Sequence, residues 1–273
     1  MYDPISQDPP YNAEFPARMS ELELVYQDAM INGVVYHPAG EGLHPLILLL
    51  HGIPGHERNL DFAQILRRAG WAVCVFHYRG SWGSGGHYRF SNILEDVKAV
   101  IDYFRQADIA EKYHIDTDNI ITIGHSLGGW ASLMTAVDGY VETAGSLSGA
   151  NVGLWGQQTI ESPDFVRPMF EAFIDSTLAP LHNVSTEDII AETEANQESW
   201  DLVQKVDALK DKKLLVLGAK RDEVVSVFDH HMPFVKALQN AGAKDLTSPL
   251  IASDHSYSNN RIEVAKILLD WLA

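Results

Sequence analysis

The chain has 273 residues, a hydrophobic fraction of 46% and a net charge of −17, a composition typical of a globular protein that can bury its own core. The acidic excess disfavours nucleic acid and anionic lipid surfaces as partners, because like charges repel. A single cysteine, Cys74, excludes an internal disulfide. Its place in an apolar run predicts an inert, buried thiol.

The start of the chain is rich in proline and lacks the apolar stretch of a secretory signal. Because proline blocks regular strand pairing, we expect residues 1–20 to form an irregular leader. No apolar run approaches the ~20 residues that a membrane-spanning helix needs. We therefore expect no membrane span and a cytoplasmic location.

Alternating strands and helices are predicted along most of the chain. Residues 22–26 and 31–36 suggest a hairpin. Apolar runs typical of buried strands then alternate with helical segments. Strands are predicted at 46–50, 72–76, 120–123, 144–147 and 214–217, and helices at 59–69, 91–107 (with Ser91 as N-cap), 127–137 and 259–272. This order predicts an α/β fold with a mostly parallel central sheet and helices on both faces.

Residues 150–205 interrupt that alternation. They contain prolines and helical spacing but no convincing strand, and Ser185 with Asp188 fits a capping box that starts a helix. We expect a helical insertion, a lid over the sheet, within a single domain that spans 1–273.

The segment Gly124-His125-Ser126-Leu127-Gly128 fits the G-x-S-x-G pattern. It follows a predicted strand and precedes a predicted helix, which is the setting of a nucleophile elbow. The alternative is a glycine-rich helix start with an incidental serine. The flanking strand and helix favour Ser126 as a nucleophile.

An oxyanion hole is expected from two backbone N–H groups. His51-Gly52-Ile53-Pro54-Gly55 follows the strand at 46–50, so the N–H of Ile53 can act beside that of Leu127. The alternative is a plain turn between a strand and a helix, which glycine and proline also suit.

The acid and the base of a triad follow the serine in this architecture. Asp222 lies in the loop after the strand at 214–217, and Glu223 is its close rival. Three histidines follow, His230, His231 and His255. The first two fit a solvated helix face, whereas His255 lies in a loop just before the last helix, so we expect His255 to be the base.

From about residue 40 onward the chain resembles the α/β-hydrolases, in particular the dienelactone-hydrolase-like and prolyl-oligopeptidase-like esterases. The resemblance rests on five motifs in order: His51-Gly52-Ile53-Pro54-Gly55, Tyr78-Arg79-Gly80-Ser81-Trp82-Gly83-Ser84-Gly85, Gly124-His125-Ser126-Leu127-Gly128-Gly129, Asp222-Glu223-Val224-Val225 and Asp254-His255. It implies a serine hydrolase with an acyl-enzyme intermediate. Dienelactone hydrolases proper use a cysteine nucleophile and the oligopeptidases carry a large propeller, so both departures favour a simple esterase.

Aromatic residues near the expected site suggest a substrate pocket. Trp82 and Tyr88 lie in a glycine-rich loop, and Trp155 and Phe170 lie in the insertion. They either line an apolar pocket or pack the lid onto the sheet. No metal-ligand spacing or nucleotide loop is present, so we expect no metal and no cofactor.

The function predicted from the sequence is hydrolysis of small or medium-sized carboxylic esters. One alternative is an amidase or peptidase with the same triad. Another is a non-catalytic binding protein on a hydrolase scaffold, although every triad position is filled. The sequence leaves the oligomeric state open.

Overall fold

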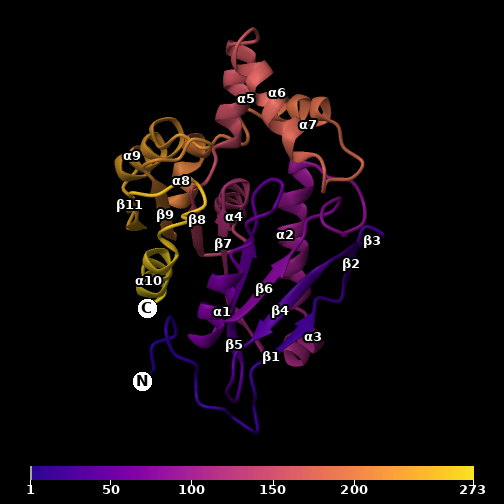
Figure 1. Ribbon diagram of the computed structural model, residues 1–273, viewed down its shortest axis with the longest axis vertical. Coiled ribbons are helices and arrows are strands. Elements are labelled where there is room, and N and C mark those ends of the chain that lie inside the picture. The colour runs from indigo at the N-terminus through magenta and orange to yellow at the C-terminus, as the bar shows by residue number, and fades with distance from the viewer. Residues whose placement is uncertain (1) are drawn as a thin grey trace.

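The computed structural model describes residues 2–273. Its main sheet has nine strands in the order β1-β4-β6-β5-β7-β8-β9-β10, with β11 also paired to β9 (Figure 1). The strands are β1 (Arg18–Glu21), β4 (Gly33–His37), β5 (His44–Leu50), β6 (Ala72–Phe76), β7 (Ile115–His125), β8 (Thr143–Leu147), β9 (Lys213–Ala219), β10 (Asp245–Thr247) and β11 (Leu250–Ile251). Only β1 and β4 pair antiparallel to their neighbours within this described sheet. The predicted mostly parallel sheet is confirmed.

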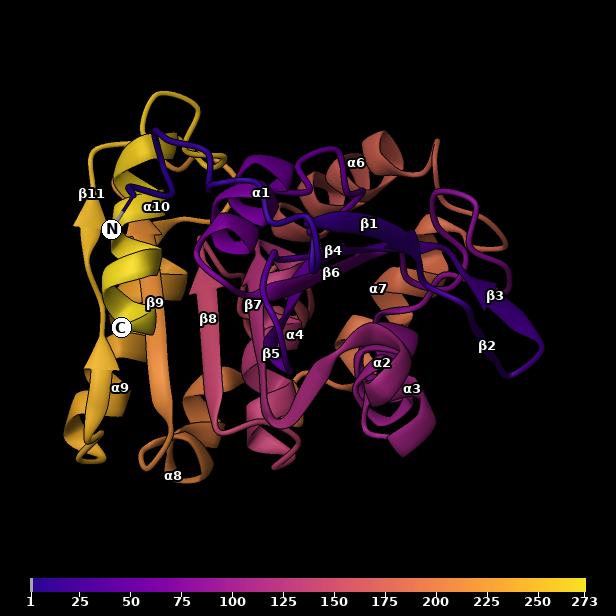
Figure 2. The same ribbon diagram turned by 90° about the horizontal axis from the view of Figure 1, so that it is seen from below.

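Helices cover both faces of the sheet (Figure 2). One face packs against α1 (Leu60–Arg68) and α10 (Arg261–Leu272). The other packs against α2 (Phe90–Phe104), α3 (Ala107–Tyr113), α4 (Leu127–Val137), α8 (Val206–Leu209) and α9 (Met232–Asn240). Side chains along a strand alternate between faces. Thus Leu48 of β5 joins the α4 side while Leu49 joins the α1 side, and both faces need apolar residues.

The first fifty residues differ from the expectation. The strand β1 begins at Arg18, inside the expected irregular leader, and pairs with β4. The last leader proline is Pro16, so nothing beyond it blocks pairing. A separate hairpin forms from β2 (Leu24–Tyr26) and β3 (Ala29–Ile31).

The expected helix at 91–107 corresponds to α2, which ends earlier, at Phe104, and the helix α3 that follows it was not predicted. Ser91 is not the N-cap, because α2 begins at Phe90 with Arg89 at the cap position and no side-chain cap from that residue. The carboxylate of Glu192 instead accepts hydrogen bonds from the N–H groups of Phe90 and Ser91. A distant residue thus satisfies the free donors of the first turn, and local sequence does not reveal it.

The insertion is helical, as predicted. It forms α5 (Val152–Glu161), α6 (Val166–Thr177) and α7 (Thr186–Ala195), which lie beyond the end of the sheet in Figure 1. The expected capping box at Ser185 and Asp188 is present at the start of α7. Within residues 2–273, no helix is long and apolar enough to cross a membrane.

Candidate active site

Ser126 lies in the sharp turn between β7 and α4. Its backbone has φ 57° and ψ −122°, a conformation that costs energy for a residue with a side chain. The turn also requires small neighbours: a Cβ at Gly124 would lie 1.9 Å from the Gly128 oxygen, and a Cβ at Gly128 would lie 2.2 Å from the Leu50 oxygen. Both glycines are therefore required by close backbone contacts around the serine.

The serine opens onto a small pocket of about 160 Å³. Its lining residues are Gly52, Ile53, Pro54, Gly55, His56, Glu57, His125, Ser126, His255 and Ser256. The loop after β5, the elbow and the loop before α10 therefore meet at one point. Ile53 and Ser126 share this pocket, and Leu127 begins α4 directly beside it. The positive end of the α4 dipole thus points at the serine.

His255 and Asp222 form a hydrogen-bonded pair. The Nδ1 of His255 lies 2.7 Å from Oδ2 of Asp222, whose side chain is only 1% exposed. The other oxygen, Oδ1, accepts hydrogen bonds from the N–H groups of Val224 and Val225. Burial raises the pKa of Asp222, but hydrogen bonds from His255 and the two amides outweigh it, so the pKa lies below its usual value.

Ser126 and His255 share the pocket without a direct hydrogen bond between their side chains within the described structure. Such bonds are often long in the free enzyme and shorten once substrate binds. Asp222 fixes the ring: because Nδ1 faces a carboxylate, Nδ1 carries the proton and Nε2 of the neutral ring keeps its lone pair.

The rival residues lie elsewhere. Glu223 is exposed, and Asp222 rather than Glu223 contacts His255. The prediction that His230 and His231 lie on a solvated helix face is wrong, because they are 6% and 8% exposed. They belong to a π-helix, Val227–His231, that packs under the insertion.

Contacts with the insertion explain the burial of His230. Its Nδ1 accepts a hydrogen bond from the N–H of Asn151 at 2.9 Å, and its ring lies 5.7 Å from that of Trp155. Burial lowers the pKa of His230 and of His231 to about 4. Both rings are therefore neutral packing groups at neutral pH.

The four aromatic residues expected in a substrate pocket do not line the pocket at Ser126. Trp82 contacts a residue that lines the pocket, because its Nε1 donates to the Pro54 oxygen. Tyr88 is fully buried. Trp155 and Phe170 pack on each other with ring centroids 5.3 Å apart. The packing interpretation is the one that their positions support.

Sequence reasoning missed His125, although it occupies the variable position before Ser126. The side chain is 4% exposed, and its Nε2 donates to the backbone oxygen of His255 at 2.9 Å. Burial lowers its pKa to about 3, so the ring stays neutral. His125 therefore anchors the loop that carries His255; a histidine between Gly124 and Ser126 was the available signal.

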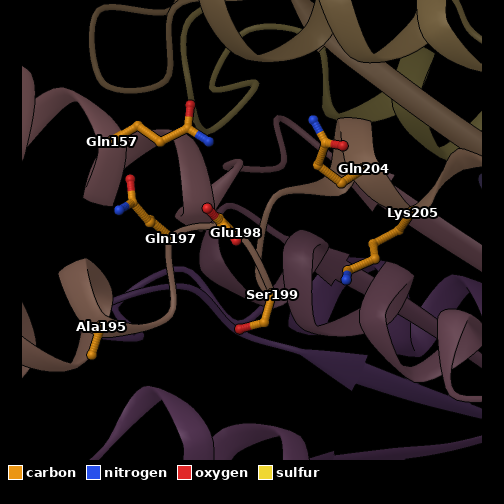
Figure 3. A pocket seen from close by; sticks show the side chains of 7 residues that line it. All are labelled: Gln157, Ala195, Gln197, Glu198, Ser199, Gln204 and Lys205. Carbon is orange, nitrogen blue, oxygen red and sulfur yellow. The ribbon is translucent and has the colours of Figure 1, made fainter.

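Another, shallow cavity of about 880 Å³ is formed within the insertion (Figure 3). It is lined by Gln157, Ala195, Gln197, Glu198, Ser199, Gln204 and Lys205. Ser199 is its only hydroxyl and no histidine lines it, so this cavity lacks a base for nucleophilic chemistry. Among residues 2–273, no group of three or more His, Cys, Asp or Glu side chains could hold a metal ion.

The strand order, the strained turn at Ser126 and the helices on both faces of the sheet define an α/β-hydrolase fold. Solved structures with this fold match nearly the whole chain. An esterase from Pyrococcus furiosus matches with a TM-score of 0.66 at 16% identity, covering 97% of this chain and 96% of that one. Est1E from Butyrivibrio proteoclasticus matches with 0.67 at 18% identity, covering 92% and 98%. The 2,6-dihydroxy-pseudo-oxynicotine hydrolase matches with 0.65 at 20% identity, covering 95% and 69%.

A family model named BD-FAE matches residues 35–165. The match includes Ile53 and Ser126 and leaves Asp222 and His255 outside. The quorum-quenching protein AidA of Acinetobacter baumannii is 31% identical over 45% of this chain and 41% of its own length. An uncharacterized 31.7 kDa protein of Escherichia coli is 39% identical over 34% and 32%. The aligned part thus covers less than half the length of either relative.

Proposed function

We propose that the chain is a serine hydrolase that cleaves carboxylic esters of small or medium-sized substrates. Ser126 is the nucleophile, His255 the general base and Asp222 the residue that orients His255. The observation that carries the proposal is the Asp222–His255 hydrogen bond beside a strained serine in one pocket. Strain at a non-glycine residue is costly and persists where it aims a reactive group.

The reaction proceeds in two halves. Nε2 of His255 takes the Ser126 proton as the oxygen attacks the ester carbon, and the N–H groups of Ile53 and Leu127 donate to the developing oxyanion. His255 then gives the proton to the leaving alcohol, which leaves an acyl-enzyme. Water repeats the same steps, releasing the carboxylic acid and restoring the serine.

The loop at 51–55 holds the Ile53 donor in place. His51 is 1% exposed, its Nδ1 donates to the Gly52 oxygen at 2.7 Å, and the hydroxyl of Tyr78 donates to the His51 oxygen. Burial lowers the pKa of His51 to about 3, so this support stays neutral. An oxyanion donor fixed before the reaction stabilises the transition state without reorganisation.

The direct test is a series of p-nitrophenyl esters of rising acyl length, assayed with wild type and Ser126→Ala. We expect turnover with short to medium chains, because the pocket beside Ser126 is only about 160 Å³. Ser126→Ala should lower kcat at least ~10³-fold, as for other triad nucleophiles. A folded variant with more than a tenth of wild-type activity would contradict the assignment.

An amidase or peptidase with the same triad is the second candidate. The fold also matches an acylaminoacyl peptidase from Pyrococcus horikoshii, with a TM-score of 0.66 at 16% identity over 94% of this chain and 41% of that one. Matched ester and anilide substrates separate the two activities. A non-catalytic binding protein would show no turnover with either and would resist an organophosphonate probe.

A further inference from the structure

Glu57 is the one carboxylate among the described residues that line the pocket at Ser126, and no lysine or arginine lines it. The pocket is small, so a fixed negative charge there acts on any substrate bound at the serine. Two unit charges several ångströms apart near a protein surface interact strongly enough to change a binding constant several-fold. The charge of Glu57 is therefore large enough to influence substrate choice.

Glu57 shares its nearest cation with a second carboxylate, Asp61, so one negative charge remains in excess. Its Oε1 accepts a hydrogen bond from the N–H of Asn59 at 2.6 Å. The nearest cation is Nη2 of Arg261, 3.8 Å away. That nitrogen already donates to Asp61 and to the Asn59 side chain, so both of its hydrogens are used. The Glu57 side chain remains 37% exposed.

Arg58, the adjacent residue, is directed elsewhere. Its guanidinium lies over the ring of Trp82, 5.6 Å from the centroid, and its Nη1 lies 3.4 Å from Nε2 of His77. Neither Trp82 nor His77 lines the pocket. Arg58 therefore does not line the pocket, and its guanidinium packs against residues outside it.

Glu57 is linked to the loop that carries His255 through Arg261. Arg261 joins the Glu57 loop to the base loop, because its Nη1 donates to the backbone oxygen of Ser256 at 2.9 Å. Ser256 follows His255 directly. Because the base gives its proton to the leaving group, we infer that the leaving group binds beside His255, in the small pocket that Glu57 and Ser256 also line.

We propose that Glu57 makes the enzyme selective for esters whose leaving group carries a positive charge, such as a quaternary ammonium or a protonated amine, close to the scissile bond. The proposal rests on the proposed function and names a substrate class for the same site. Glu57 takes no part in proton transfer. It binds the cation of the leaving group and repels an anionic one.

The test compares three acetyl thioesters that differ in the charge of the leaving group. Acetylthiocholine is the cation, neohexyl thioacetate its uncharged isostere, and S-acetyl mercaptopropionate the anion. Release of free thiol gives kcat/KM for each with wild type, Glu57→Gln and Glu263→Gln. Glu263 is the matched control: it is an exposed carboxylate on neighbouring α10 that bonds Asn260 and does not line the pocket.

We expect the ratio of kcat/KM for the cation to that for the neutral isostere to fall about three- to tenfold in Glu57→Gln, with the anion gaining relative to the isostere. The ratio should stay within about twofold of wild type in Glu263→Gln, since that charge is solvent-screened. Raising the salt concentration should reduce the wild-type preference and leave Glu57→Gln nearly unchanged. The ratio is independent of how much of each preparation is folded.

Two results would overturn the proposal in distinguishable ways. Turnover of the neutral isostere with an equal cation ratio in wild type and Glu57→Gln would refute the role of Glu57 and leave the esterase assignment standing. No thiol release from any of the three substrates, together with no labelling of Ser126 by an organophosphonate, would refute the esterase assignment and the role of Glu57 with it.

Discussion

At the scale of single residues, Asp222 is the part of the site with the best-defined surroundings. Its two oxygens accept three hydrogen bonds, from His255, Val224 and Val225. These bonds lower its pKa despite burial, so the carboxylate stays charged below the pH at which an ordinary carboxyl group takes up a proton. It can therefore hold the His255 ring throughout the pH range in which the proposed hydrolysis would run.

Replacing Asp222 by Asn should lower kcat about 10³- to 10⁴-fold. The amide can present its NH₂ to Nδ1, which favours the wrong imidazole tautomer. Glu223→Gln is the matched control, because Glu223 is exposed and has no contact with His255. Its kcat should stay within about threefold of wild type. Steady-state kinetics on one ester checks both, and the reverse order of losses would make Glu223 the acid.

The residue-level predictions from sequence differ in how well the positions could be anticipated. Ser126 lies in a recognisable G-x-S-x-G motif, and His255 follows the acid in chain order, in a loop just before the last helix. The structure brings both residues to one pocket. Glu57 could not be anticipated from sequence, because its position depends on how separate loops meet, whereas His125 lies inside the elbow motif and only its contact with the His255 loop was hidden. The burial of His230 depends on Asn151, about 80 residues away.

At the scale of elements, hydrogen bonds join the two ends of the insertion to each other and its middle to the loop between β6 and α2. Asn151 donates to Asp201 and accepts from the N–H of Leu202. The N–H of Tyr88 donates to the His182 oxygen and that of His182 to the Gly80 oxygen. We propose that residues 150–205 form a cap fixed on a single domain rather than a separate unit.

Glu192 is the clearest link between the insertion and the helices under it. Its carboxylate accepts from the N–H groups of Phe90 and Ser91 at 2.8 and 3.0 Å, and also from the Ser91 hydroxyl. Glu192→Ala should lower the free energy of unfolding by about 2 kcal/mol, because the first turn of α2 loses its cap. Thermal unfolding followed by circular dichroism measures the change, roughly a 4 °C drop in Tm.

The control for this prediction is Glu187→Ala on the same helix. Glu187 is 69% exposed and pairs with Arg167 at the surface, so its loss should cost less than about 1 kcal/mol. Both changes place the same residue in α7, so helix propensity affects them alike. Equal destabilisation in the two variants would show that Glu192 does not cap α2.

The order of strands and helices was largely predictable, because strands buried on both faces appear in the sequence as short continuous apolar runs. The strand at 72–76 and the helix at 127–137 have the predicted bounds. The short strands β10 and β11 were not predicted, since two or three residues carry no recognisable period. The expected hairpin between residues 22–26 and 31–36 did not form, because most of the second segment belongs to β4. That strand pairs with β1 on one side and β6 on the other.

At the scale of the whole molecule, buried histidines make stability depend on pH. Six of them are buried with pKa values lowered to about 3 or 4: His37, His51, His77, His125, His230 and His231. In the unfolded chain a histidine takes up its proton near pH 6.5. Between about pH 6.5 and pH 4 the unfolded state therefore binds more protons than the folded state.

Acidification over that window should destabilise the fold. The histidine contribution is complete above about pH 6.5 and is lost as the pH falls toward 4. Between pH 7.5 and pH 5.5 each buried histidine lowers the free energy of unfolding by about 1 kcal/mol. Urea unfolding at the two pH values measures the effect, and we expect a lower midpoint at pH 5.5. An unchanged or higher midpoint would mean that relief of the −17 net charge outweighs the histidines.

The central claim is that Ser126 is an activated nucleophile at the meeting point of three loops. The most direct measurement is labelling with a fluorophosphonate, followed by mass spectrometry of the peptides. The account predicts one modified residue, Ser126, with labelling strongly slowed in Asp222→Asn and absent in Ser126→Ala. Labelling at another serine, or undiminished labelling of Ser126→Ala, would contradict it.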